Sequence, residues 1–157
     1  MGTRKVTVQH PVGRYEPIEI EARAPLVELR DPQPRAARAA VRAMLDHSRL
    51  PPSARDGLVG AVSEVVTNAH SYGSGVVHLQ GWVDGEAAVV TVSDEGSGPD
   101  QSDLDRRPGA RGPGEGGLGL WLATNLCDEV ALGRLPHGFA VRLRSFAHAR
   151  AGELTSP

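Results

Sequence analysis

The sequence predicts an α+β two-layer sandwich, in which helices pack against a sheet of antiparallel strands. Helix-forming segments gather in the middle of the chain, and two pairs of β-rich runs are each joined by a short turn. The apolar residues are mostly Val, Leu and Ala, with only 4% aromatic residues. Segregated helices beside hairpin-connected strands are typical of α+β domains. At 157 residues the chain can bury one core, so we expect a single domain.

Two helices are predicted in the first half of the chain. Residues 34–45, PRAARAAVRAML, are rich in strong helix formers, and Ala37, Val41 and Leu45 recur at helical spacing. The segment LPPS then interrupts the helix, and Ser53 is a candidate N-cap for the next one. This second helix is expected over about residues 54–69. Its predicted buried face consists of Leu58, Ala61, Val62, Val65 and Val66.

The remaining segments predict strands, a short helix and a long loop. Residues 1–33 alternate weakly between proline-containing turns, which predicts one or two edge strands. Runs at 76–83 and 87–93 predict a hairpin, and a second hairpin is expected to pair 129–132 with 139–146. A third helix is expected over about 118–127. The polar, glycine-rich residues 95–117 predict a mobile functional loop, and residues 148–157 predict a flexible tail.

Composition excludes several classes of function. The net charge is −2 and the basic residues, nearly all arginine, are spread along the chain, so we expect no direct nucleic-acid binding. No apolar run approaches the roughly twenty residues of a membrane span, and no secretory signal is recognisable. The single cysteine, Cys127, suits a reducing compartment, and we expect a cytoplasmic protein. The six histidines lack ligand spacing, so no zinc or iron site is expected.

The first chemical motif is EVVTNA on the second predicted helix. Glu64 and Asn68 are four residues apart, so both side chains leave the same helix face. An amide oxygen beside a carboxylate suits hydrated Mg²⁺ between phosphates, because this ion takes few protein ligands. Asn68 would bind the metal, and Glu64 would orient or deprotonate an attacking hydroxyl. Taken alone, the pair also fits the solvent edge of an ordinary amphipathic helix.

The second motif, DEGSG, follows the apolar strand AVVTVS. An ionised Asp94 accepts hydrogen bonds and donates none, so it could accept from the exocyclic amino group of adenine but would repel the keto oxygen of guanine. Gly96 and Gly98 would let the backbone turn sharply beneath a flat ligand. A strand-ending Asp that caps a glycine turn is the ordinary structural alternative.

The third motif is the glycine-rich run GEGGLGL at 114–120, which leads into a helix. The first free N–H groups of a helix can bind phosphate oxygens, and glycines allow the backbone to approach. The run lacks the Lys of a P-loop and the preceding strand of a Rossmann fingerprint. Arg106, Arg107 and Arg111, in the loop between the motifs, could close over a triphosphate or contact an acidic partner. His70 and Tyr72 follow Asn68 and are candidates for the mouth of the pocket.

The ordered set EVVTNA, DEGSG and GGLGL resembles the ATP-binding domain shared by gyrase, histidine kinases and mismatch-repair ATPases, the Bergerat fold, from about Pro34 to Arg144. The form SEVVTNAHSYG and the ending GLWLATNLCDEVALGRLPHGFAVRLRS most resemble the stand-alone anti-sigma-factor serine kinases of bacteria. The resemblance implies a mixed, mostly antiparallel sheet covered on one face by helices. It divides the chain into an N-terminal extension (1–33), an ATPase domain (34–147) and a tail (148–157).

The same resemblance implies roles for individual residues, ATP and Mg²⁺ as cofactors, and partners. By position, Asn68 would ligate magnesium, Glu64 would act as general base and Asp94 would bind adenine. Gly96 and Gly98 would shape the adenine pocket. Gly117, Leu118 and Gly119 would offer backbone amides to the phosphates. Members of that family sequester a sigma factor, phosphorylate a serine of an antagonist protein, and are typically dimers.

Three departures from the family pattern leave a second hypothesis open. Gly138 is followed by Phe139 and Ala140, where the family often has a Thr or Ser that helps to bind adenine. Tyr72 stands where a histidine is usual, and Glu115 where a glycine is common. The alternative function is therefore an ATP-binding interaction module with little or no kinase activity. The catalytic half of a two-component histidine kinase is less favoured, because no phosphoacceptor helix precedes the domain.

Overall fold

The computed structural model describes residues 23–99 and 118–147. The elements follow one another as β1 (Val27–Arg30), α1 (Pro34–Leu45), α2 (Pro52–Tyr72), β2 (His78–Asp84), β3 (Ala87–Asp94), α4 (Leu118–Leu126), β4 (Glu129–Leu135) and β5 (Gly138–Phe146). The predicted mobile loop, apart from its first residues, and the predicted tail lie outside the described residues, as does most of the N-terminal extension.

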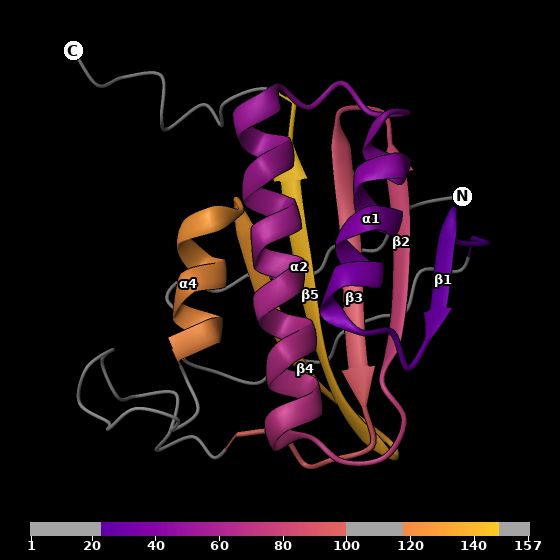
Figure 1. Ribbon diagram of the computed structural model, residues 1–157, viewed down its shortest axis with the longest axis vertical. Coiled ribbons are helices and arrows are strands. Elements are labelled where there is room, and N and C mark those ends of the chain that lie inside the picture. Colours follow the sequence, from indigo (N-terminus) through magenta and orange to yellow (C-terminus); the bar gives the residue numbers. More distant parts are fainter. Residues whose placement is uncertain (1–22, 100–117, 148–157) are drawn as a thin grey trace.

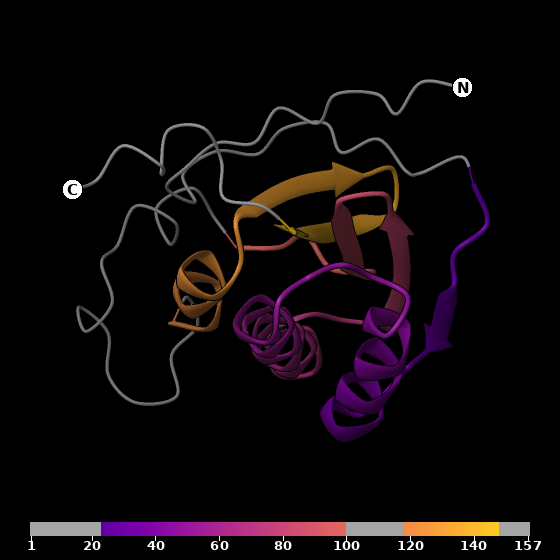
Figure 2. The same ribbon diagram turned by 90° about the horizontal axis from the view of Figure 1, so that it is seen from above.

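The strands form one five-stranded sheet with the order β1-β2-β3-β5-β4, and every pairing in the described part of the chain is antiparallel. The helices α1, α2 and α4 lie together on one face of this sheet, as the view from above shows most clearly (Figure 2). The predicted α+β two-layer sandwich, with helices on one face, is confirmed. No helix in the described ranges is long and apolar enough to cross a membrane.

The helix-facing side of the sheet and the inner faces of the helices form one apolar core. The predicted positions Ala37, Val41 and Leu45 of α1 are fully buried. The predicted inner face of α2 is buried as well, together with alternate residues of the strands, including Leu79, Val90, Val92, Val141 and Leu143. Burial of this apolar surface supplies the main driving force for packing the two layers.

Both helix starts use proline rather than a side-chain cap. α1 spans the predicted residues, with Pro34 in its first turn. α2 is longer than expected, and the prediction of Ser53 as its N-cap is wrong: Pro51 is the cap residue and Pro52 begins the helix. Proline is well suited to this position because its missing N–H would have no partner inside the helix.

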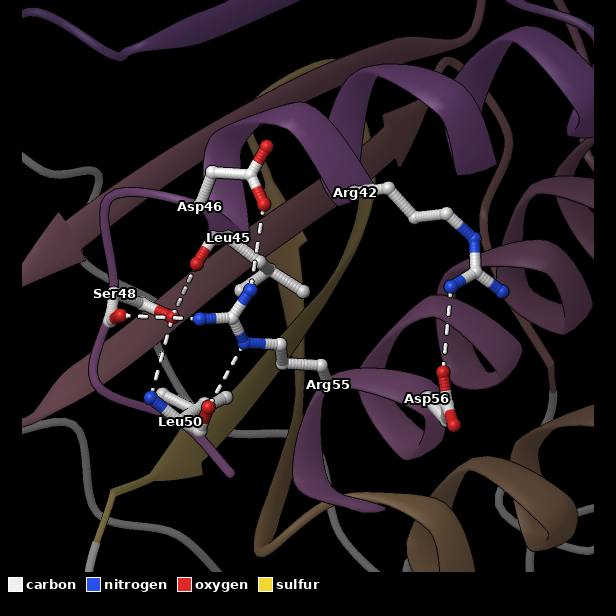
Figure 3. A network of polar contacts seen from close by, with 7 residues as sticks. All are labelled: Arg42, Leu45, Asp46, Ser48, Leu50, Arg55 and Asp56. Carbon is white, nitrogen blue, oxygen red and sulfur yellow. Dashed lines mark hydrogen bonds and ion pairs between the residues drawn. The ribbon is translucent and has the colours of Figure 1, made fainter. Parts of the chain in front are cut away.

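The connection between α1 and α2 is fixed by Arg55 (Figure 3). Its Nε donates to the carbonyl oxygen of Leu50 at 2.8 Å, and its Nη2 approaches the carbonyl oxygen of Ser48 at 3.4 Å. Its Nη1 lies 3.4 Å from the carboxylate of Asp46. One side chain of α2 thus satisfies the backbone of the turn that leaves α1.

α2 and α4 approach each other closely and run antiparallel (Figure 1). A Cβ atom at Gly57 would overlap the backbone carbonyl oxygen of Leu126 near the end of α4. One turn further along α2, a Cβ atom at Gly60 would lie 3.3 Å from the Cδ1 of the Leu126 side chain. The backbone contact requires glycine at position 57, whereas the side-chain contact can adjust.

This difference predicts opposite effects of two alanine substitutions in the same helix. Alanine is favoured over glycine in a helix interior by about 1 kcal/mol, so Gly60→Ala should leave the stability unchanged or raise it. Gly57→Ala should destabilise the domain by about 1–3 kcal/mol, because α4 must move away from α2. The measurement is thermal unfolding, in which each kcal/mol lowers the midpoint by about 2–4 °C. Equal midpoints for the two variants would contradict the proposed close approach.

Cys127, directly after α4, is a partly buried thiol. Burial raises the pKa of this thiol to about 12, because desolvation disfavours the thiolate. Its Sγ lies 3.1 Å from the carbonyl oxygen of Ala123. The side chain therefore behaves as a small core residue rather than as a nucleophile.

The raised pKa predicts slow alkylation of Cys127. At pH 8 the folded protein should react with iodoacetamide about two to three orders of magnitude more slowly than the urea-unfolded chain, because only the thiolate attacks. Mass spectrometry of timed samples measures both rates. Comparable rates in the folded and unfolded chain would mean that the thiol is not desolvated.

Candidate functional site

Two of the elements that carry the predicted motifs, β3 and α2, end together at the lower end of the molecule in Figure 1, and α4 lies beside α2. β3 ends there with Asp94, and α2 ends there with Tyr72. α4 begins beside the middle of α2 and runs away from that end, because its last residue, Leu126, lies beside Gly57 near the opposite end of α2. A helix rises about 1.5 Å per residue, so the first residue of α4 lies about 12 Å along α2 from Gly57, towards Asn68.

Asp94 is the most firmly positioned of the predicted residues. Its side chain is buried, and the residue is 7% exposed. Its Oδ1 accepts a hydrogen bond from the backbone N–H of Gly96 at 2.7 Å and a longer one from that of Ser74 at 3.4 Å. Backbone N–H groups of two separate segments therefore orient one carboxylate at the end of a strand. No hydrogen bond to its Oδ2 is present among the described residues.

The space around this carboxylate depends on glycines from both sides. A Cβ atom at Gly73, just after α2, would lie 2.6 Å from Oδ2 of Asp94. A Cβ atom at Gly96 would lie 2.8 Å from Oδ1. Real Cβ atoms essentially never make contacts this short, so any other residue at position 73 or 96 would displace the Asp94 carboxylate. Gly98, four residues after Asp94, has a φ of +75°, a conformation that glycine adopts without strain and L-residues rarely adopt.

Glu64 and Asn68 lie in the last turns of α2 and are both half-buried. They continue the row that begins with Gly57 and Gly60, since spacings of three and four residues fall on one helix face. That row faces α4. The neighbouring Ser63 and Thr67 lie off this row: Ser63 Oγ accepts a hydrogen bond from Arg38 of α1 at 2.8 Å, and Thr67 Oγ1 donates to the carbonyl oxygen of Ser63 at 2.8 Å.

The predicted phosphate-binding run falls partly outside the described residues. Leu118 and Gly119 are the first two residues of α4, so their backbone N–H groups belong to the helix end whose donors have no partner inside the helix. Gly117 lies outside the described residues, as do Glu115 and the three arginines Arg106, Arg107 and Arg111. The helix dipole favours an anion at the end of α4 that faces the site.

The strand beside Asp94 adds two residues to the site. Gly138 begins β5, and a Cβ atom there would overlap the carbonyl oxygen of Asp94. Phe139 is the register partner of Asp94 and is buried. An aromatic ring therefore lies on the strand next to Asp94, at the residue paired with it.

His70, one of the two candidates for the pocket mouth, contacts the backbone of the segment before α1. Its Nε2 lies 2.7 Å from the carbonyl oxygen of Pro32, which ties the end of α2 to the segment between β1 and α1. Tyr72 is 55% exposed. Gly73, Ser74 and Glu95 were given no role from the sequence, although Gly73, Ser74 and Gly75 directly after α2 are residue types that often turn a chain.

The candidate metal ligand on α2 suits a magnesium ion that is shared with phosphates rather than one bound by protein side chains alone. Among residues 23–99 and 118–147, no three His, Cys, Asp or Glu side chains gather closely enough to hold a metal ion. Mg²⁺ usually keeps several waters and takes only one or two protein ligands beside substrate phosphates. Asn68 would offer one such ligand, and Glu64 lies one turn before it on the same helix face.

Residues 27–145 match the family model described as the histidine kinase-like ATPase domain. Among solved structures, the chain is similar to the NMR structure of the histidine kinase domain of the E. coli osmosensor EnvZ, with 20% sequence identity and a TM-score of 0.45. That match covers 88% of this chain and 99% of the other. No curated protein sequence matches the chain significantly.

Proposed function

The chain belongs to the family of histidine kinase-like ATPase domains, and on that premise we propose that it binds ATP with Mg²⁺ and acts as a regulatory serine kinase of the anti-sigma-factor type. It would sequester a sigma factor and phosphorylate a serine of an antagonist protein in the cytoplasm. The observation that supports the proposal is the buried carboxylate of Asp94, which backbone N–H groups of two segments orient beside the end of the helix that carries Glu64 and Asn68.

Each segment contributes a distinct part of the chemistry. Asp94 would accept a hydrogen bond from the adenine amino group, because an ionised carboxylate has acceptors and no donor. Asn68 would supply an oxygen to Mg²⁺, which neutralises charge on the phosphates. The first backbone N–H groups of α4 would bind phosphate oxygens.

Glu64 is the candidate general base for transfer. It would accept the proton of the serine hydroxyl while that oxygen forms a bond to the terminal phosphorus and the bond to the ADP oxygen breaks. Its position one turn before Asn68 supports this role, since metal ligand and base would then lie on the same helix row.

The second candidate is an ATP-binding interaction module with little or no catalysis. The residue that favours it is Phe139, which stands opposite Asp94 where the family often has Thr or Ser. Without that hydroxyl, the adenine loses one hydrogen-bonding group, so nucleotide could bind as an effector without transfer. Incubation with labelled ATP and candidate antagonist proteins separates the two functions, because a pure binding module leaves no phosphoserine.

Asp94→Asn tests the nucleotide site. The remaining amide oxygen can still accept the N–H of Gly96, so the fold should persist, but the new amide group repels the adenine amino group. We expect ATP affinity, measured by calorimetry with Mg²⁺, to fall by about tenfold or more, as for a lost hydrogen bond to a charged group. Asp56→Asn, at an exposed residue near the start of α2 and away from Asp94, is the matched control. Equal affinity for wild type and Asp94→Asn would defeat the assignment.

Glu64→Ala separates binding from transfer. Loss of the base should leave ATP affinity close to that of the wild type and slow phosphoserine formation by about 10²–10⁴-fold. Rates from labelled ATP and affinities from calorimetry give the two quantities independently. A variant that transfers phosphate at the wild-type rate would remove Glu64 from the mechanism.

A further inference from the structure

Glu95, the residue after Asp94, bonds to the connection between α2 and β2 (residues 73–77) through both its side chain and its backbone. Its Oε2 accepts the backbone N–H of Val76 at 2.7 Å. Its own backbone N–H donates to the carbonyl oxygen of Ser74 at 2.8 Å. The carboxylate reaches a backbone donor about twenty residues away in sequence, so this contact is specific to the folded chain.

The backbone of residues 73–77 passes directly against the Glu95 carboxylate. Gly75 adopts a φ of +68°, a conformation that glycine adopts without strain. A Cβ atom at Gly75 would overlap the Glu95 carboxylate, so the side chain lies directly against the backbone of the connection. The hydrogen bond to Val76 also explains why β2 begins at His78, two residues later than the sequence predicts. The N–H groups of Val76 and Val77 bond to the carboxylates of Glu95 and Asp31 instead of a strand.

The same connection touches the carboxylate that would bind adenine. Ser74 donates its N–H towards Oδ1 of Asp94 and accepts the N–H of Glu95 at its carbonyl oxygen. Gly73 lies against Oδ2 of Asp94. Any displacement of residues 73–76 therefore moves one of the two donors of Asp94 and opens the space beside its other oxygen.

From these contacts we infer that Glu95 is a positioning residue: it fixes the α2–β2 connection against the end of β3 and thereby sets the orientation of Asp94. It acts through Ser74 and Gly73, without contacting the nucleotide. The inference rests on the proposed nucleotide site and adds a determinant of its affinity. When the bond to Val76 is lost, the connection must be ordered each time nucleotide binds, which weakens binding.

Two substitutions of Glu95 and one control test this role. Glu95→Ala removes the acceptor of the Val76 N–H, whereas Glu95→Gln keeps an acceptor oxygen on a side chain of the same length. Glu86→Ala, in the turn between β2 and β3 at the opposite end of these strands, removes an exposed carboxylate that pairs with Arg49. It controls for the loss of one negative charge.

The measurements are amide hydrogen exchange at Ser74 and Val76 and the affinity for ATP with Mg²⁺. In Glu95→Ala we expect faster exchange at both amides and an affinity for ATP about tenfold lower, whereas Glu95→Gln and Glu86→Ala stay within about twofold of the wild type. In the transfer assay, Glu95→Ala should raise the KM for ATP and leave kcat unchanged.

The outcomes distinguish this inference from the proposed function. A wild-type protein that binds no ATP overturns both. Wild-type binding together with unchanged affinity in Glu95→Ala overturns the inference alone, as does unchanged exchange at Val76. Failure of Glu95→Gln to restore the affinity would show that the charge of Glu95, rather than its hydrogen bond to Val76, is what matters, and would also overturn it.

Discussion

The contact between the end of β3 and the end of α2 is the constraint on which the candidate site depends. Asp94 lies on the strand side of this contact, and Asn68 and Glu64 lie on the helix side. The bonds of Ser74 to Asp94 and Glu95 join the two sides directly. Because a carboxylate accepts backbone N–H groups from both segments, the strand residue cannot move independently of the helix end.

The packing of α4 against α2 positions the start of α4, which is the third element of the candidate site. Gly57 and Gly60 let α4 approach α2 at the end of the sandwich away from Asp94. Since the two helices are antiparallel, this approach directs the start of α4 towards the row that continues through Glu64 and Asn68. A core contact near one end of α2 thus determines where the first N–H groups of α4 lie, and these are the groups proposed to bind phosphate.

Much of this arrangement could be predicted because it is encoded locally. The period of Ala37, Val41 and Leu45 defined α1, and the short turns between β-rich runs defined both hairpins. Asp94 was recognisable as a strand-ending carboxylate before glycines. The start of α2 was predicted wrongly, because a serine resembles a cap in sequence while proline occupies the first turn. The bonds from Glu95 to the α2–β2 connection could not be predicted, because they join segments whose proximity only the folded sheet creates.

The central claim is that one nucleotide contacts both α2 and the end of β3. The most direct test is an NMR titration with Mg²⁺ and a non-hydrolysable ATP analogue, observing the backbone amides and the side-chain amide of Asn68. The account predicts that Asn68, Ser74 and Gly96 shift together, at one common affinity, while amides of the α1–α2 connection remain unchanged. Shifts that leave both Asn68 and Gly96 unaffected, or that follow two separate affinities at these residues, would contradict it.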